Sequence, residues 1–144
     1  MKVKEVKYGK RNIAAGLFFM AGFMAYGFAL IYMRDFAPDK VAWIADANNG
    51  THFEARLAHV HGNLFALLNI VFGFLLMYLP VPAKKANIIS WTILLGMLMP
   101  LGIMGEFLLG LPPIFVVLGA ISIVFGTAYF GWTVKGLNSA ASRE

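Results

Sequence analysis

Four long runs of residues without a formal charge divide this chain, and they constrain its fold more than any other feature. The runs cover residues 12–33, 57–79, 86–105 and 112–134. Since a helix rises about 1.5 Å per residue, each run is long enough to cross a hydrocarbon layer of about 30 Å. Only 13% of the 144 residues are charged, whereas soluble domains carry about 25%. We therefore predict an all-α membrane protein in which residues 1–144 form a single membrane domain, an antiparallel four-helix transmembrane bundle.

Prolines mark where these helices end, bend or begin. Pro80 and Pro82 follow the second run, and proline cannot continue a helix. Pro100 lies within the third run, so we expect a kink there. We expect the fourth helix to begin at Pro112 or Pro113, because the first position of a helix has no use for the N–H that proline lacks.

Lysine and arginine are distributed unequally between the segments that join these runs. With a cytoplasmic N-terminus, the inner segments carry nine of the twelve basic residues: Lys2, Lys4, Lys7, Lys10, Arg11, Lys84, Lys85, Lys135 and Arg143. The outer segment carries the other three: Arg34, Lys40 and Arg56. Because basic residues are enriched in cytoplasmic loops, we predict that both termini are cytoplasmic in a multi-pass protein of the cell inner (plasma) membrane. The net charge of +5 then indicates the lipid bilayer as partner, and no nucleic acid.

Pairs of small residues four positions apart recur in the first and fourth runs. They are Ala21/Ala25, Ser122/Gly126 and Thr127/Gly131. Such pairs allow helix backbones to approach closely in a membrane. The pairs fit either an interface between copies of the chain or packing inside one bundle.

The most informative polar feature is the pair His59 and His61 at the start of the second run. Positions two apart on a helix point about 160° away from each other, so the two imidazoles cannot hold one metal from a regular helix. Asn63 lies four residues after His59 and can bond to it or to its ligand. Phe65 continues the stripe of His61, and Gly62 allows a large group to approach the helix.

The chain contains no cysteine, so a haem iron would need histidine or methionine as its axial ligand. A histidine beside a glycine and a phenylalanine suits a porphyrin that lies against a helix. Two alternatives remain open. In the first, both histidines bond to Glu54, Glu106 or lipid headgroups; in the second, His59, His61 and Asn69 form a short proton relay with Glu106.

The segment Ala55–Gly62 reads Ala-Arg-Leu-Ala-His-Val-His-Gly and leads into an apolar helix that ends at Leu79 and Pro80. It resembles the second helix of the styrene oxide isomerase family, whose members are small four-helix membrane proteins. In that family this helix opens with an arginine and an Ala-His pair, followed by a small residue or glycine and then an asparagine. Residues 16–36 look like the family's first helix. Residues 108–113, with the helix that follows them, look like its fourth.

The resemblance implies a homotrimer that binds haem b at its subunit interfaces through an axial histidine. Ferric haem would act as a Lewis acid and open a small apolar epoxide to a carbonyl compound without net redox change. His59 matches the ligand by motif position, whereas the position of the helix end favours His61. Asn63 and Asn69 are the candidates for the asparagine that holds the substrate oxygen.

The histidine pair also looks like the histidine-bearing helices of haem-copper oxidase relatives, which implies haem binding without epoxide chemistry. In both cases we expect the cofactor to be surrounded by His59, His61, Gly62, Phe65 and Arg56. His59 would bind the metal, and Arg56 and Glu106 would lie at the entrance of the site. The alternative functions are a non-catalytic haem-binding or accessory subunit of a larger membrane complex, and a structural protein without a cofactor.

Overall fold

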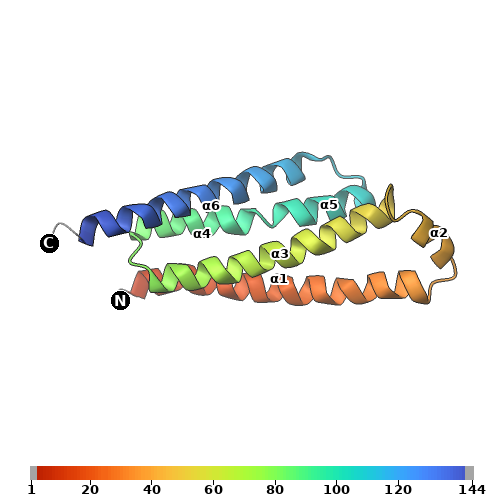
Figure 1. Cartoon of the computed structure of the whole chain (residues 1–144), viewed down its shortest axis with the longest axis horizontal. Helices are drawn as coiled ribbons and strands as arrows, with labels where there is room; N and C mark the ends of the chain where they lie inside the picture. The colour runs from red at the N-terminus through yellow and green to blue at the C-terminus, as the bar shows by residue number, and fades with distance from the viewer. Residues whose placement is uncertain (1–2, 142–144) are drawn as a thin grey trace.

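The computed structural model describes the backbone of residues 3–141 and the side chains of residues 7–137. These residues form helices and connecting turns, with no strand among them. The helices are α1 (Val3–Asp35), α2 (Lys40–Ala45), α3 (Thr51–Tyr78), α4 (Ala83–Leu95), α5 (Leu98–Leu109) and α6 (Ile114–Ala141). Figure 1 shows a long, narrow bundle with the short α2 at one end, which we call the α2 end.

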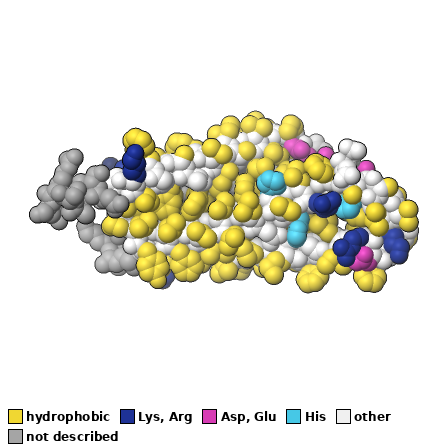
Figure 2. Space-filling model, viewed as in Figure 1, with side chains coloured by type: hydrophobic (Ala, Val, Ile, Leu, Met, Phe, Trp, Pro, Cys, Tyr) yellow, Lys and Arg dark blue, Asp and Glu magenta, His cyan; other side chains and the backbone are white. Residues whose placement is uncertain are grey.

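Four segments of this bundle are long and apolar enough to cross a membrane: Lys7–Asp35, Thr51–Tyr78, Ala83–Leu109 and Ile114–Leu137. They confirm the four spans expected from the uncharged runs. Large apolar side chains also cover much of the outside of the bundle; Phe18, for example, is 80% exposed. On the face in Figure 2, hydrophobic side chains occupy the middle of the bundle. The fold is therefore that of a multi-pass membrane protein.

Helices α1 and α3 lie side by side along their length (Figure 1) and approach closely at glycines. A methyl group on Gly16 would lie 2.7 Å from the carbonyl oxygen of Ala66. Nearer the end of α3, a methyl group on Gly73 would lie 2.7 Å from the carbonyl oxygen of Gly9. A side chain at any of these glycines would separate the two backbones, so the small residues fix the contact between the helices.

The third span is broken where its proline requires it. The break between α4 and α5 falls at Gly96 and Met97, which confirms an interruption in this span but places it up to four residues before Pro100. Proline clashes with the carbonyl four residues earlier and offers it no N–H; for Pro100 that carbonyl belongs to Gly96. The Met99 N–H donates to the Gly96 carbonyl at 3.0 Å instead, so the group stays satisfied in the membrane.

The fourth span begins one or two residues later than the prolines suggest. Gly110 ends α5 with φ 66°, a left-handed conformation that glycine adopts readily. The Val117 N–H donates to the Pro113 carbonyl at 3.1 Å, so Pro113 caps the helix and Ile114 is its first residue. The prediction of a start at Pro112 or Pro113 is corrected accordingly.

The connection between α1 and α3 contains the turn that Asn48-Asn49-Gly50 predicts, with Gly50 at φ 148°. The Trp43 ring of α2 stacks on the His52 ring at 4.4 Å between centroids. The backbone carbonyl of Trp43 lies 2.7 Å from Nδ1 of His52. These contacts attach α2 to the first turn of α3, and they fix the position of His52 at the α2 end.

One pair of small residues serves packing within the chain. Ser122 donates to the carbonyl of Thr92 at 2.8 Å, and a methyl group on Gly126 would lie 2.6 Å from Oγ1 of Thr92. The other two pairs, Ala21/Ala25 and Thr127/Gly131, are exposed. For Ser122 and Gly126, packing inside one bundle is therefore the observed arrangement.

Candidate functional site

A groove between α1 and α3 contains the first of the two predicted histidines. Its volume is about 660 Å³, and it is lined by Met24, Gly27, Phe28, Leu30, Ile31, His59, Val60 and Asn63. We call it the histidine groove. His59 and Asn63 share its wall because they are four residues apart on one face of α3. The other lining residues are apolar except for Gly27, so the groove presents an imidazole and an amide in an otherwise apolar surface.

His59 lies against α1 at a glycine. A methyl group on Gly27 would lie 2.8 Å from Nε2 of the imidazole, so a side chain at this position would displace the His59 ring. The ring of Tyr26 lies 6.0 Å from the imidazole, tilted by 55°. Within the described chain no hydrogen bond engages either ring nitrogen of His59, so the imidazole remains available as a ligand or base.

Asn63 makes the expected contact with the residue four positions earlier, but through the backbone. Its Nδ2 donates to the carbonyl oxygen of His59 at 2.9 Å. This bond holds the amide beside the imidazole in the wall of the histidine groove. The amide oxygen and the second amide hydrogen remain for a bound molecule.

His61 lies outside the residues that line the histidine groove. Its Nδ1 lies 2.9 Å from the carbonyl oxygen of Leu57, and its ring meets Phe65 edge-on at 6.0 Å. Because a carbonyl only accepts, Nδ1 carries the proton of the neutral ring and Nε2 keeps a lone pair. Histidines that bind metals commonly have this arrangement. The two histidines therefore occupy different surroundings, in agreement with their spacing.

Three further predicted site residues lie in the bundle interior. Gly62, Phe65 and Asn69 are buried. A methyl group on Gly62 would collide with the ring of Phe23, so the large group that approaches this glycine belongs to α1 of the same chain. All three residues pack the bundle, and a direct contact with a cofactor or substrate stays a prediction for them.

Asn69 belongs to a buried polar network that was not among the predicted features. Asn12, Asn69 and Ser90 are fully buried where α1, α3 and α4 meet. Nδ2 of Asn12 donates to Oδ1 of Asn69 at 2.9 Å, and the Ser90 hydroxyl donates to Oδ1 of Asn12. Nδ2 of Asn69 donates to the carbonyl of Phe65 at 3.0 Å. Both ends of the Asn69 amide are thus hydrogen-bonded within the protein.

Arg11 closes this network at the end of the bundle opposite α2. Its Nη2 donates to the hydroxyl of Ser90 at 2.6 Å, and its guanidinium lies 4.2 Å from the centre of the Trp91 ring. A sequence signal for the network did exist: an uncharged polar residue inside an apolar span needs a partner, and Asn12, Asn69 and Ser90 all lie in the predicted spans.

Arg56 lines a second hollow that adjoins the histidine groove. This hollow has a volume of about 360 Å³ and is lined by Leu30, Ile31, Arg34, His52 and Arg56; we call it the arginine hollow. It shares Leu30 and Ile31 with the histidine groove. Figure 2 shows histidine and basic side chains near one another toward the α2 end.

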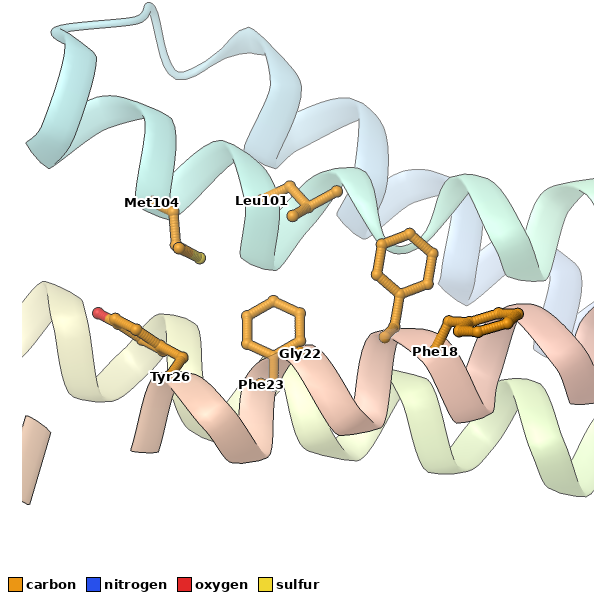
Figure 3. Close-up of a pocket in the computed structure, with 7 residues that line it drawn as sticks. Phe18, Gly22, Phe23, Tyr26, Leu101 and Met104 are labelled. Atoms are coloured by element: carbon orange, nitrogen blue, oxygen red, sulfur yellow. The ribbon is translucent and has the colours of Figure 1, made fainter. Parts of the chain in front are cut away.

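An apolar slot of about 250 Å³ lies between α1 and α5 (Figure 3). It is lined by Phe18, Phe19, Gly22, Phe23, Tyr26, Leu101 and Met104. The Tyr26 hydroxyl donates to the carbonyl of Ala55 at 3.2 Å, so the one polar group of the lining has its bond partner. Tyr26 lines this slot and also contacts His59. Its side chain therefore lies between the slot and the histidine groove.

Glu106 lies near the end of α5 with its Oε1 buried and without a hydrogen-bond partner among the described residues. No group of three or more histidine, aspartate or glutamate side chains could hold a metal ion in the described part of the chain. A haem iron takes only one or two axial ligands from the protein, so a haem site does not require such a group.

Comparison with models of known protein families, with curated proteins and with solved structures gives no match to this chain.

Proposed function

We propose that the protein is a haem-b-binding protein of the cell inner membrane, built as an antiparallel bundle with both termini in the cytoplasm. The distribution of lysine and arginine supports this orientation, because nine of the twelve lie in the segments assigned to the inside. The α2 end then faces outward. The histidine groove opens near that side, within the membrane.

His59 is the proposed axial ligand. Its imidazole lies in an apolar groove with both nitrogens free of bonds to described residues, and the absence of a side chain at Gly27 makes room for the ring against α1. These residues fit a haem in their chemistry: a neutral nitrogen donor and apolar walls for a porphyrin. Because Nε2 now lies against the backbone of α1, the ring must turn from Gly27 toward the groove to coordinate iron.

The chemistry proposed for the site is the redox-neutral isomerisation of a small apolar epoxide to a carbonyl compound. When bound, ferric haem would supply a Lewis acid for this reaction. Met24 and Phe28 keep water away from the groove. Asn63 orients the substrate oxygen through the amide hydrogen that its bond to the His59 carbonyl leaves free. Asn69 is the second candidate for this role, although its amide is engaged with Asn12.

A second copy of the chain would complete the groove. Phe28 is 73% exposed and Val60 is 61% exposed, so the groove is open on its lipid side. A cofactor lying there would be covered by a neighbouring subunit, as the resemblance to a trimeric family implies. We therefore propose a homo-oligomer with the cofactor between subunits.

The experiment that tests this function is the absorption spectrum of protein purified from membranes. A Soret band is expected, and a preparation without one that also fails to bind added haem b contradicts the proposal. A matched pair of variants locates the site. Gly27→Leu places a side chain against the His59 ring and should weaken haem binding about tenfold. Gly22→Leu lies on the same helix with nothing within 4 Å of its Cβ position and should leave binding unchanged.

A second candidate function is that of a non-catalytic haem-binding or accessory subunit of a larger membrane complex. The bond between Nδ1 of His61 and the Leu57 carbonyl favours it, since this bond prepares a second imidazole for a metal. Two histidine ligands, one from each of two copies, would leave no coordination position for a substrate. A six-coordinate low-spin spectrum without turnover of aryl epoxides would favour this function, and conversion of an aryl epoxide to an aldehyde would exclude it.

A further inference from the structure

The arginine hollow combines positive charge with apolar walls at the level where the spans end. Arg34 and Arg56 line it together with Leu30 and Ile31. Nε and Nη2 of Arg34 donate to the carboxylate of Asp35 at 2.9 and 2.7 Å, which leaves its Nη1 free. Among the described residues, the Arg56 guanidinium makes one hydrogen bond, a long one of 3.5 Å from Nη1 to the carbonyl of Ala47. Arg56 therefore makes fewer and longer hydrogen bonds to described residues than Arg34 does.

Arg56 also lines another hollow, which has a volume of about 160 Å³ and is formed with Phe53, Leu57 and Val60. Apolar side chains thus accompany Arg56 in both hollows. Val60 also lines the histidine groove, so this apolar lining continues along the membrane-spanning part of α3.

We infer that the arginine hollow binds the headgroup of an anionic phospholipid. Charge complementarity indicates an anion, because guanidinium groups bind phosphate oxygens well. The apolar side chains that accompany Arg56 in both hollows match the acyl chains of a lipid and have no use in a site for a soluble anion. The position of the hollow agrees as well, since arginines at the ends of membrane spans extend their charged groups toward the lipid headgroups. This inference does not rest on haem binding.

The test uses the full chain, without added haem, in detergent with equal amounts of phosphatidylglycerol and phosphatidylcholine. Native mass spectrometry measures the ratio of the two lipids retained. We expect wild-type protein to prefer phosphatidylglycerol. Arg56→Gln should lower that preference about fivefold, the effect of one basic residue at a membrane surface. Arg56→Lys should restore part of it, because the charge returns without the planar donor group.

The matched control is Lys40→Gln, which removes one positive charge from the same end of the bundle but from outside the hollow. It should leave the lipid ratio unchanged. An equal loss in Lys40→Gln and Arg56→Gln would overturn the inference, because the effect would then belong to the total charge. It would also be overturned if wild-type protein retained both lipids equally, or if glycerol phosphate displaced phosphatidylglycerol as well as the lipid itself does.

Discussion

Buried polar side chains in this protein are of two kinds, those with partners and those without. Asn12, Asn69 and Ser90 bond to one another and to backbone carbonyls between three helices. Nε1 of Trp43 and Oε1 of Glu106 are buried and have no such partner among the described residues. A polar group without a partner is costly in a membrane interior, so the first set stabilises the fold. His59 is only half-buried, and its imidazole stays available to a bound molecule.

Replacing Asn69 by leucine tests the structural role of the first set. Asn69→Leu removes the bonds to Asn12, Phe65 and Ile93 and leaves the amide of Asn12 short of one acceptor. We expect the free energy of unfolding to fall by about 1–3 kcal/mol, measured by reversible denaturation in mixed micelles. Thr127→Val, at an exposed position of α6, is the control and should have little effect. Equal stability of wild-type protein and Asn69→Leu would refute the structural role.

At the scale of elements, the broken third span is held in place by the helix beside it. α6 packs against both α4 and α5. A methyl group on Gly119 would meet the backbone nitrogen of Met99 and lie 2.8 Å from the carbonyl carbon of Leu98. Glycine at this position lets α6 contact the backbone of α5 just after the break between α4 and α5. A side chain there would therefore disturb the bent part of the third span.

Two alanine substitutions in α6 should have effects of opposite sign. Gly119→Ala places a methyl group against the backbone of α5 and should lower the free energy of unfolding by about 1–3 kcal/mol. Gly131→Ala adds the same group where nothing lies within 4 Å, and it should raise stability by about 0.5–1 kcal/mol through helix propensity. Denaturation of the two variants side by side provides the measurement. A loss of the same size in both would show that the contact with α5 is not the cause.

The helices themselves could be predicted from the sequence because length and absence of charge are properties of each segment alone. The break of the third span was also foreseeable, but Pro100 acts on the carbonyl of Gly96, so the interruption precedes the proline. Contacts between helices were not foreseeable. The partners of Asn12 and Ser90, and the room that Gly27 makes for the His59 ring, depend on which helix faces meet. Glycine is common in membrane helices, so Gly27 carried no signal of its own.

At the scale of the whole molecule, the proposed orientation makes the two ends of the bundle face different compartments. The chain has no cysteine, so a single introduced cysteine can be labelled without background. A membrane-impermeant maleimide added to intact cells should label Asn49→Cys at the α2 end. It should label Lys84→Cys only after the membrane is opened. Both positions are exposed, so both should react in opened membranes, and labelling of Lys84→Cys alone in intact cells would reverse the orientation.

The most direct test of haem ligation by His59 is the absorption spectrum of the His59→Gly variant, with and without added imidazole. Glycine removes the ligand and leaves a space that free imidazole can enter. We predict that His59→Gly loses the Soret band of the purified protein, that imidazole restores it, and that His61→Gly keeps it throughout. An unchanged band in His59→Gly, together with its loss in His61→Gly, would contradict the assignment.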